Sequence, residues 1–227
     1  MRIIINHYLD STFPGLELAH SIFNQWDIGI HFELGKGMYQ LNDDGSLNMD
    51  MFHLVYQQSF LLFHELFSYR DDILLVTNLY QNASIIQKKR TKIYDRYVKN
   101  KELKYQINLE NIPYIWEVEE EKTYTTRLSL QCRKADIKYK QLIKAACNED
   151  FPLQPKLARK SHSLLLYPDL FFINLSKNLI FFIYDDRGCE VIAKDKETLI
   201  PLYEKYGDWI DEFSREKVDS CFRSKGE

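Results

Sequence analysis

Three short apolar runs near the end of the chain constrain the fold more than any other feature. They are separated by short polar linkers and cover residues 170–175 (LFFINL), 179–184 (LIFFIY) and 189–193 (CEVIA). Each run has the length of a strand and is short for a helix. Linkers this short join antiparallel neighbours, because a parallel crossover needs a dozen or more residues. The region therefore predicts a three-stranded antiparallel meander.

The second linker, Asp185-Asp186-Arg187-Gly188, is either a reactive cluster or only a turn. A type I turn favours Asp at its first position and Gly at its fourth. Gly188 can also take the left-handed conformation that makes a bulge and restores the pairing of the two strands. The turn explains Asp185 and Gly188 without a function. Asp186 and Arg187 are then expected at the exposed tip, free to bind a partner.

Hydrophobic spacing predicts the other elements, with helical spacing for helices and strict alternation for strands. We expect helices over 15–25, 48–67, 84–99, 136–147 and 196–206, and strands over 28–34, 73–80, 104–112 and 123–133. The strand over 123–133 alternates so cleanly that one of its faces is expected to be wet. A last short helix is expected after Ser214, a favourable capping residue.

Together these elements predict an α+β fold, which is a mainly antiparallel sheet with a C-terminal three-strand meander, packed against helices. The chain of 227 residues is long enough for one large domain or two small ones. We expect a single domain over 1–227, and a division into subdomains 1–103 and 104–227 is the alternative.

Charge and apolar content exclude two classes of function. The net charge is −3, whereas a general polyanion binder is usually basic, so nucleic acid is not favoured as a partner. No apolar run approaches the roughly 18 residues of a membrane span, and the first residues do not form a convincing signal peptide. The sequence thus predicts a cytoplasmic protein without membrane contact. Its isolated cysteines are expected as free thiols, namely Cys132, Cys147, Cys189 and Cys221.

Sequence motifs offer little for catalysis. No Gly-rich phosphate loop and no nucleophile elbow occurs. His31 and Glu33 share one side of a predicted strand, and such a pair can serve in acid–base chemistry or as two metal ligands. No third ligand is identifiable, so no metal, no cofactor and no catalytic residue is predicted. A hydrolase or nuclease with a site built around His31 and Glu33 is the alternative function.

Charge is distributed unevenly along the chain. Residues 88–104 contain eight Lys or Arg and two acids, a pattern of a helix that touches nucleic acid or, more simply, of a solvated helix face. Residues 117–121 (EVEEE) contain four acids and no base. Such an acidic run can mimic a phosphate backbone and plug the basic site of a partner protein.

Two segments resemble a known family. They are GIHFELG (29–35) and IYDDRGCEVIAKDKETLIPLYEKYGDWIDEFSREKVDSCF (183–222), and they resemble an uncharacterised bacterial family, domain of unknown function 3885. The resemblance extends from about Gly29 to Phe222, and family members often have Arg where this chain has His31. The members look like small cytosolic proteins of Gram-positive bacteria, and many such proteins lie beside toxin genes and act as immunity proteins. The resemblance carries over no catalytic residue and no cofactor.

These observations predict a cytosolic protein-binding module, of the immunity type, that occludes a cognate toxin. The expected contact residues come from the acidic run and from the turn: Glu117, Glu119, Glu120, Glu121, Asp185, Asp186 and Arg187. The sequence predicts neither the identity of the partner nor the oligomeric state.

Overall fold

An antiparallel sheet organises the structure, a computed structural model that describes residues 5–82, 92–113, 123–157 and 167–223. The strands are β1 (Gly29–Glu33), β2 (Asp72–Asn82), β3 (Asn108–Pro113), β4 (Thr123–Arg133), β5 (Asp169–Asn174), β6 (Leu179–Ile183) and β7 (Gly188–Ala193). Within the described residues they form one seven-stranded sheet in the order β1-β7-β6-β5-β2-β4-β3. All neighbouring pairs are antiparallel. The α+β fold class and the C-terminal meander of β5, β6 and β7 are confirmed.

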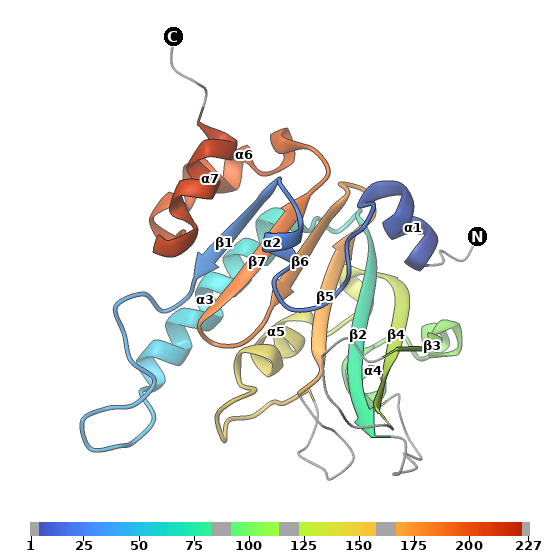
Figure 1. The fold of residues 1–227 in the computed structure, drawn as a ribbon. Coiled ribbons are helices and arrows are strands. Elements are labelled where there is room, and N and C mark those ends of the chain that lie inside the picture. Colours follow the sequence, from blue (N-terminus) through green and yellow to red (C-terminus); the bar gives the residue numbers. More distant parts are fainter. Residues whose placement is uncertain (1–4, 83–91, 114–122, 158–166, 224–227) are drawn as a thin grey trace.

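Helices cover both faces of the sheet and one of its edges. The α-helices are α1 (Ile5–Thr12), α2 (Ile22–Gln25), α3 (Met49–Leu66), α4 (Lys92–Tyr97), α5 (Tyr139–Cys147), α6 (Ile200–Lys205) and α7 (Arg215–Phe222). Short 3₁₀ helices are η1 (Lys101–Gln106), η2 (Lys134–Asp136), η3 (Lys196–Thr198), η4 (Gly207–Trp209) and η5 (Glu212–Ser214). α3, α4 and α5 lie on one face, α1 and α2 on the other, and α6 and α7 beside edge strand β1 (Figure 1). Along the described residues, no helix has the length and apolar character needed to cross a lipid bilayer.

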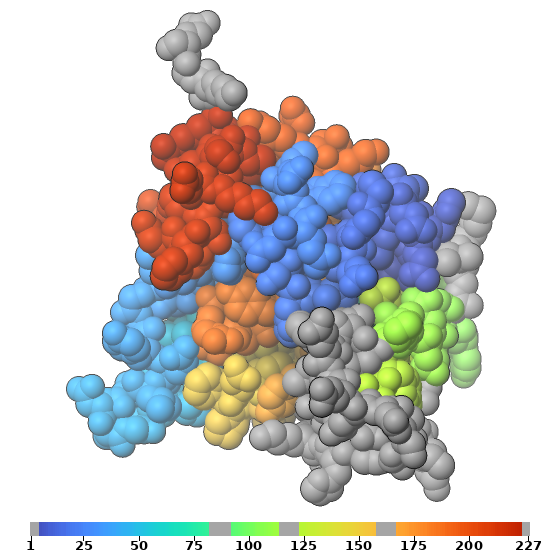
Figure 2. Space-filling model, in the orientation of Figure 1, coloured from blue at the N-terminus to red at the C-terminus, as the bar shows by residue number. Residues whose placement is uncertain are grey.

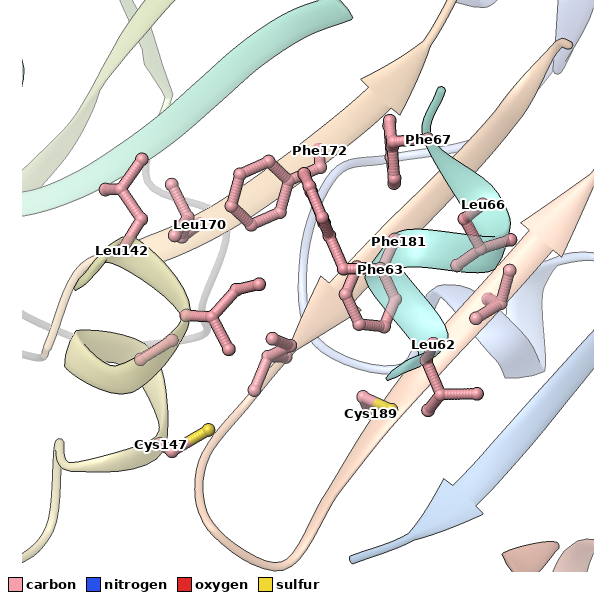
Figure 3. Packing of buried hydrophobic residues seen from close by; sticks show 14 of the residues in the cluster. Leu62, Phe63, Leu66, Phe67, Leu142, Cys147, Leu170, Phe172, Phe181 and Cys189 are labelled. Atoms are coloured by element: carbon pink, nitrogen blue, oxygen red, sulfur yellow. The ribbon is translucent and has the colours of Figure 1, made fainter. Parts of the chain in front are cut away.

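α3 is the central helix of the larger core, as its apolar stripe predicts. It begins after Asn48, whose side-chain oxygen accepts a hydrogen bond from the backbone N–H of Met51. Phe63 lies near the C-terminal end of the helix, on the side that faces the sheet (Figure 3). Its ring centroid is 5.0 Å from that of Phe172 on β5 and 4.9 Å from that of Tyr139 on α5. One aromatic side chain therefore joins the two helices to the sheet.

The N-terminal segment corrects the helix predicted over 15–25, because only α2 is helical there. Gly15 and Ser21 have positive φ angles of 83° and 63°, which interrupt a right-handed helix. Leu16 and Leu18 are nevertheless buried, since this irregular segment packs directly on the sheet. The apolar spacing predicted the burial of the segment correctly and its conformation wrongly.

Strand β4 has the predicted bounds but not the predicted wet face. The side chain of Arg127 is buried, and its Nε donates a hydrogen bond to Oδ1 of Asn78 on β2 at 3.0 Å. Asn78 in turn donates to the carbonyl oxygen of Leu18 at 2.7 Å. The N-terminal segment thus covers this face of the sheet. Burial lowers the pKa of the Arg127 guanidinium, although Glu110 opposes that shift.

Other predicted elements differ from the structure at their ends. The strand predicted over 104–112 begins at Asn108, because η1 occupies the residues before it. The helix predicted over 196–206 is divided into η3 and α6, and Pro201 lies in the first turn of α6, where proline is tolerated. Of the helix predicted over 84–99, α4 is described, and its Ile93 and Tyr97 are buried as their spacing predicts. Residues 83–91 lie outside the described part of the chain.

Strands from the two halves of the chain are mixed in the sheet, because β2 lies between strands of the second half. β2 pairs with β5 on one side and with β4 on the other. β1 pairs with β7, so its neighbour also comes from the second half. The hydrogen bonding of the sheet therefore crosses the boundary at residue 103 repeatedly.

Candidate functional site

The linker of residues 185–188 connects β6 and β7 as the predicted hairpin, but its turn differs from the predicted one. Oδ1 of Asp185 accepts a hydrogen bond from the backbone N–H of Arg187 at 2.7 Å, which is an Asx-type turn. Gly188 does not have the positive φ angle that the predicted bulge requires. Glycine is needed there for space, because a Cβ would lie 2.6 Å from the carbonyl oxygen of Phe32 and against the hydroxyl of Tyr184.

The two aspartates of this turn are buried, which corrects the expectation that Asp186 is free at the tip. Asp185 is 5% exposed and Asp186 is 1% exposed. Oδ2 of Asp186 accepts a hydrogen bond from Nε2 of Gln40 at 3.0 Å. Burial raises the pKa of the Asp186 carboxyl, and the charge of Asp185 adds to that rise. Only Arg187 is exposed, and its guanidinium pairs with Asp185.

Gln40 belongs to a second, smaller hairpin, which we call the acidic hairpin and define as residues 39–48. Leu41 and Leu47 form an isolated antiparallel bridge in it. The backbone N–H of Asn42 donates to the carbonyl oxygen of Ser46 at 2.8 Å. Oδ1 of Asp44 accepts from both the backbone N–H and the hydroxyl of Ser46, at 2.9 and 2.6 Å. These bonds fix the turn at 42–45, whose sequence Asn-Asp-Asp-Gly is typical of turns.

Hydrogen bonds also close the base of the acidic hairpin and join the hairpin to the β6–β7 tip. The backbone N–H of Asn48, at the start of α3, donates to the carbonyl oxygen of Gln40 at 2.9 Å. The side-chain amide of Asn48 donates to the carbonyl oxygen of Tyr39 at 3.0 Å. The bond from Gln40 to Asp186 adds an attachment to the β6–β7 tip. The hairpin is therefore closed at its base and joined to the β6–β7 tip by one hydrogen bond between side chains.

The outer surface of this hairpin combines apolar and acidic side chains. Tyr39 is 81% exposed and Leu41 is 50% exposed. Asp43 and Asp44 lie beside them and are also exposed. An open hollow of about 590 Å³ lies against these residues. Figure 2 shows the projecting hairpin in light blue at the lower left, next to the β6–β7 tip in orange.

His31 is held by a separate polar cluster at the edge of the sheet. Its Nδ1 lies 2.9 Å from Oγ of Ser214, and its Nε2 lies 2.9 Å from the hydroxyl oxygen of Tyr184. Oγ of Ser214 also donates to Oδ2 of Asp211 at 2.9 Å. Burial lowers the pKa of His31, and the charges of Asp211 and Glu33 oppose that shift. Ser214 precedes α7 as predicted, but its hydroxyl bonds these side chains and makes no capping bond to the helix.

His31 and Glu33 do not form a hydrogen-bonded pair. Glu33 is half-exposed, and its carboxylate lies 3.7 Å from the ammonium of Lys36. Within the described ranges, no group of three or more His, Cys, Asp or Glu side chains is placed to hold a metal ion. The hydrolase or nuclease stays a prediction: His31 lies against Ser214 and is 3.7 Å from a carboxylate oxygen of Asp211, but Glu33 pairs with Lys36 instead.

The remaining predicted contact residues lie outside the described part of the chain. These are Glu117, Glu119, Glu120 and Glu121, which fall within residues 114–122. The turn and the acidic run therefore cannot be joined into one described surface. The acidic hairpin was not among the predicted contacts, although the polar sequence Asn-Asp-Asp-Gly at 42–45 indicates an exposed turn there.

Sequence patterns also gave no sign of Glu149, which follows α5. It is 4% exposed, and among the described residues neither of its carboxylate oxygens has a hydrogen-bond partner. Burial raises its pKa to about 8, although the charge of Lys156 lowers it. The nearby Asp150 is exposed. Position in the fold, rather than residue type, distinguishes these two adjacent acids.

The two segments that resemble a known family lie together in the structure. β1 carries most of residues 29–35, and it pairs with β7 from the second segment. The chain after α6 bridges to the other side of β1 through Phe32 and Ile210. A profile described as "Domain of unknown function (DUF3885)" matches residues 5–214. The chain belongs to the DUF3885 family.

A relative of this DUF3885 chain is found in Bacillus subtilis (strain 168), where it carries the name "Uncharacterized protein YnaE". The two are 46% identical over 208 residues, which cover 91% of this chain and 96% of the relative. No solved structure matches the DUF3885 chain. The similarity is therefore established along nearly the whole of both chains.

Proposed function

We propose that the protein is a cytosolic protein-binding module, of the immunity type, that occludes a site on a cognate toxin. The observation that carries this proposal is the acidic hairpin. It is a projection held by hydrogen bonds, and it presents Tyr39 and Leu41 to solvent. Exposed apolar side chains that gather on one projection mark a surface for a partner.

The hydrogen bonding of the hairpin supports a binding role. Binding to an ordered projection costs less conformational entropy than binding that must first order a flexible loop. Tyrosine is a frequent centre of protein interfaces, because it contributes a large contact area with few rotatable bonds. Tyr39 contributes little area to the core, so its exposure has no evident role in stability.

The contact residues predicted from the sequence have different roles at this surface. Arg187 is exposed beside the acidic hairpin and is available for direct contact. Asp185 and Asp186 are buried, so they position their neighbours through hydrogen bonds and do not contact the partner directly. The acidic run at 117–121 stays a proposed contact. A toxin as the partner, and the cytosol as the location, rest on analogy with small proteins encoded beside toxin genes.

A tagged pull-down from the native host, read by mass spectrometry, tests the proposal. The baits are the wild-type protein, the double variant Tyr39→Ala/Leu41→Ala, and the matched control Tyr105→Ala/Leu61→Ala. Tyr105 and Leu61 are similarly exposed and lie on other elements, η1 and α3. We expect one stoichiometric protein with the wild type and the control, and its loss with the hairpin variant.

Two results would contradict parts of the proposal. If no bait returns a stoichiometric protein, the binding role is wrong. If the hairpin variant retains the partner as well as the wild type does, the contact lies elsewhere on the molecule. Circular dichroism and thermal unfolding of each bait establish that the exchanged side chains leave the fold intact.

A further inference from the structure

The acidic hairpin also indicates the chemistry of the partner, an inference that rests on the function proposed above. We infer that the hairpin receives a positively charged protein segment with one apolar anchor side chain. Charge, shape and the geometry of self-association each support this assignment.

Charge is the first support. The segment around the hairpin carries Asp43, Asp44 and Asp50, all exposed, and one base, Lys36. The base at the neighbouring β6–β7 tip, Arg187, is paired with Asp185. The ammonium of Lys36 is already 3.7 Å from the carboxylate of Glu33. Within the described part of the chain, no Lys, Arg or His side chain forms an ion pair with any of the three aspartates. The uncompensated charge therefore favours lysines and arginines on the partner.

The shape of the surface is the second support. Tyr39, Leu41 and half-buried Met38 line the open hollow of about 590 Å³ together with the two acids, Asp43 and Asp44. A hollow of this size accepts a large side chain. An apolar side chain from the partner would cover Tyr39 and Leu41, and flanking basic residues would then lie near the two aspartates.

A second copy of this chain fits the surface poorly. In a two-fold symmetric dimer the same patch meets itself, so each aspartate approaches its own counterpart or a neighbouring one. Asp43 and Asp44 would then be brought together, while the exposed base beside the hairpin, Arg187, is already paired with Asp185. Phosphate-rich partners are disfavoured for the same reason. A basic protein segment is the occupant that the charges allow.

Selection from a displayed library of random peptides tests this inference without knowledge of the native partner. The full-length wild-type protein is the target, after depletion of the library on the Tyr39→Ala/Leu41→Ala variant. We expect the enriched peptides to carry a net positive charge and one aromatic or large aliphatic residue. Their affinities are then measured by fluorescence anisotropy at low and at high salt.

Variants that lack charges of the hairpin test whether those charges contribute to peptide binding. Asp43→Asn/Asp44→Asn removes two charges, and asparagine keeps the Oδ1 acceptor that holds Ser46. We expect about fivefold weaker peptide binding to this variant, and weaker binding of the wild type at high salt. The control Glu197→Gln/Glu204→Gln removes two exposed charges from η3 and α6, and it should bind as the wild type does.

Three outcomes would overturn the inference. The first is enrichment of neutral or acidic peptides, and the second is equal affinity for the wild type and Asp43→Asn/Asp44→Asn. The third is self-association of the wild type that Tyr39→Ala abolishes, as measured by analytical ultracentrifugation. If one of these occurs while the pull-down returns a partner, the binding role stands and the assigned charge is wrong. A pull-down without any partner would instead contradict the binding role itself.

Discussion

Two turns of this protein have similar compositions and opposite surroundings. Residues 42–45 (NDDG) form the tip of the acidic hairpin, and residues 185–188 (DDRG) form the tip of the β6–β7 hairpin. Asp43 and Asp44 are exposed, whereas Asp185 and Asp186 are buried. Both segments make turns, so local composition determines the conformation. It does not determine which side chains remain in contact with water.

The difference comes from what packs against each turn. The backbone N–H of Leu34, just after β1, donates to the carbonyl oxygen of Arg187 at 2.8 Å. Gln40 covers Asp186 from the side of the acidic hairpin. The turn at 42–45 has only internal bonds, apart from those that attach the base of its hairpin. Distant segments therefore bury one acidic turn and leave the other free.

Glu149 is another buried acid, and its substitution is expected to have the largest effect on the free energy of unfolding. Its pKa in the folded protein, about 8, exceeds the ordinary value of 4.5. The stability linked to this carboxyl is therefore fully present below pH 4.5 and is lost as pH rises toward 8. Glu149→Gln cannot ionise, so we expect it to be more stable than the wild type at pH 8 by up to about 4 kcal/mol.

Urea unfolding at about pH 5 and pH 8 measures this difference. The neighbouring exposed acid supplies the matched control, Asp150→Asn, which should keep the pH dependence of the wild type. If Glu149→Gln loses stability between these pH values as the wild type does, the burial of Glu149 is not responsible for the loss.

Gly188 and Gly45 lie in the two turns, and their substitution by alanine separates a steric cost from a conformational cost. Gly188→Ala is expected to destabilise the protein by about 3 kcal/mol, since the new Cβ lies 2.6 Å from a backbone oxygen. Gly45→Ala is expected to cost about 1 kcal/mol, because its φ of 80° strains alanine but no atom lies within 4 Å. Urea denaturation of both variants measures the costs. Equal losses would mean that the β6–β7 tip is no more crowded than the exposed turn.

The smallest effect is expected at Ser46. Hydrogen bonds from Ser46 to the Asp44 carboxylate lower the pKa of that carboxyl, and the bond from the hydroxyl contributes most. Ser46→Ala should raise the pKa of Asp44 toward its ordinary value, with little change in stability because the turn is exposed. Titration followed by NMR measures the shift, and Ser220→Ala is the control on an exposed helix position. An unchanged pKa would show that the hydroxyl bond does not persist in solution.

Local patterns predicted the elements well where burial and conformation follow from the same spacing. The alternation over 123–133 gave the bounds of β4, and the stripe over 48–67 gave α3. Long-range packing decided the rest. Arg127 is buried because the N-terminal segment folds over β4, and Asp186 is buried because Gln40 reaches it from far along the chain. Neither contact has a signal in the neighbouring sequence.

The pairing of early strands with late ones has a consequence for biosynthesis. β1 and β2 leave the ribosome first, yet all of their strand partners lie between Thr123 and Ala193. The nascent chain therefore carries the apolar strand β2 unpaired until most of its sequence has been made. Pairing between residues so distant in sequence slows folding and prolongs the exposure of apolar surface. The strands that complete the sheet are therefore among the last to be synthesised.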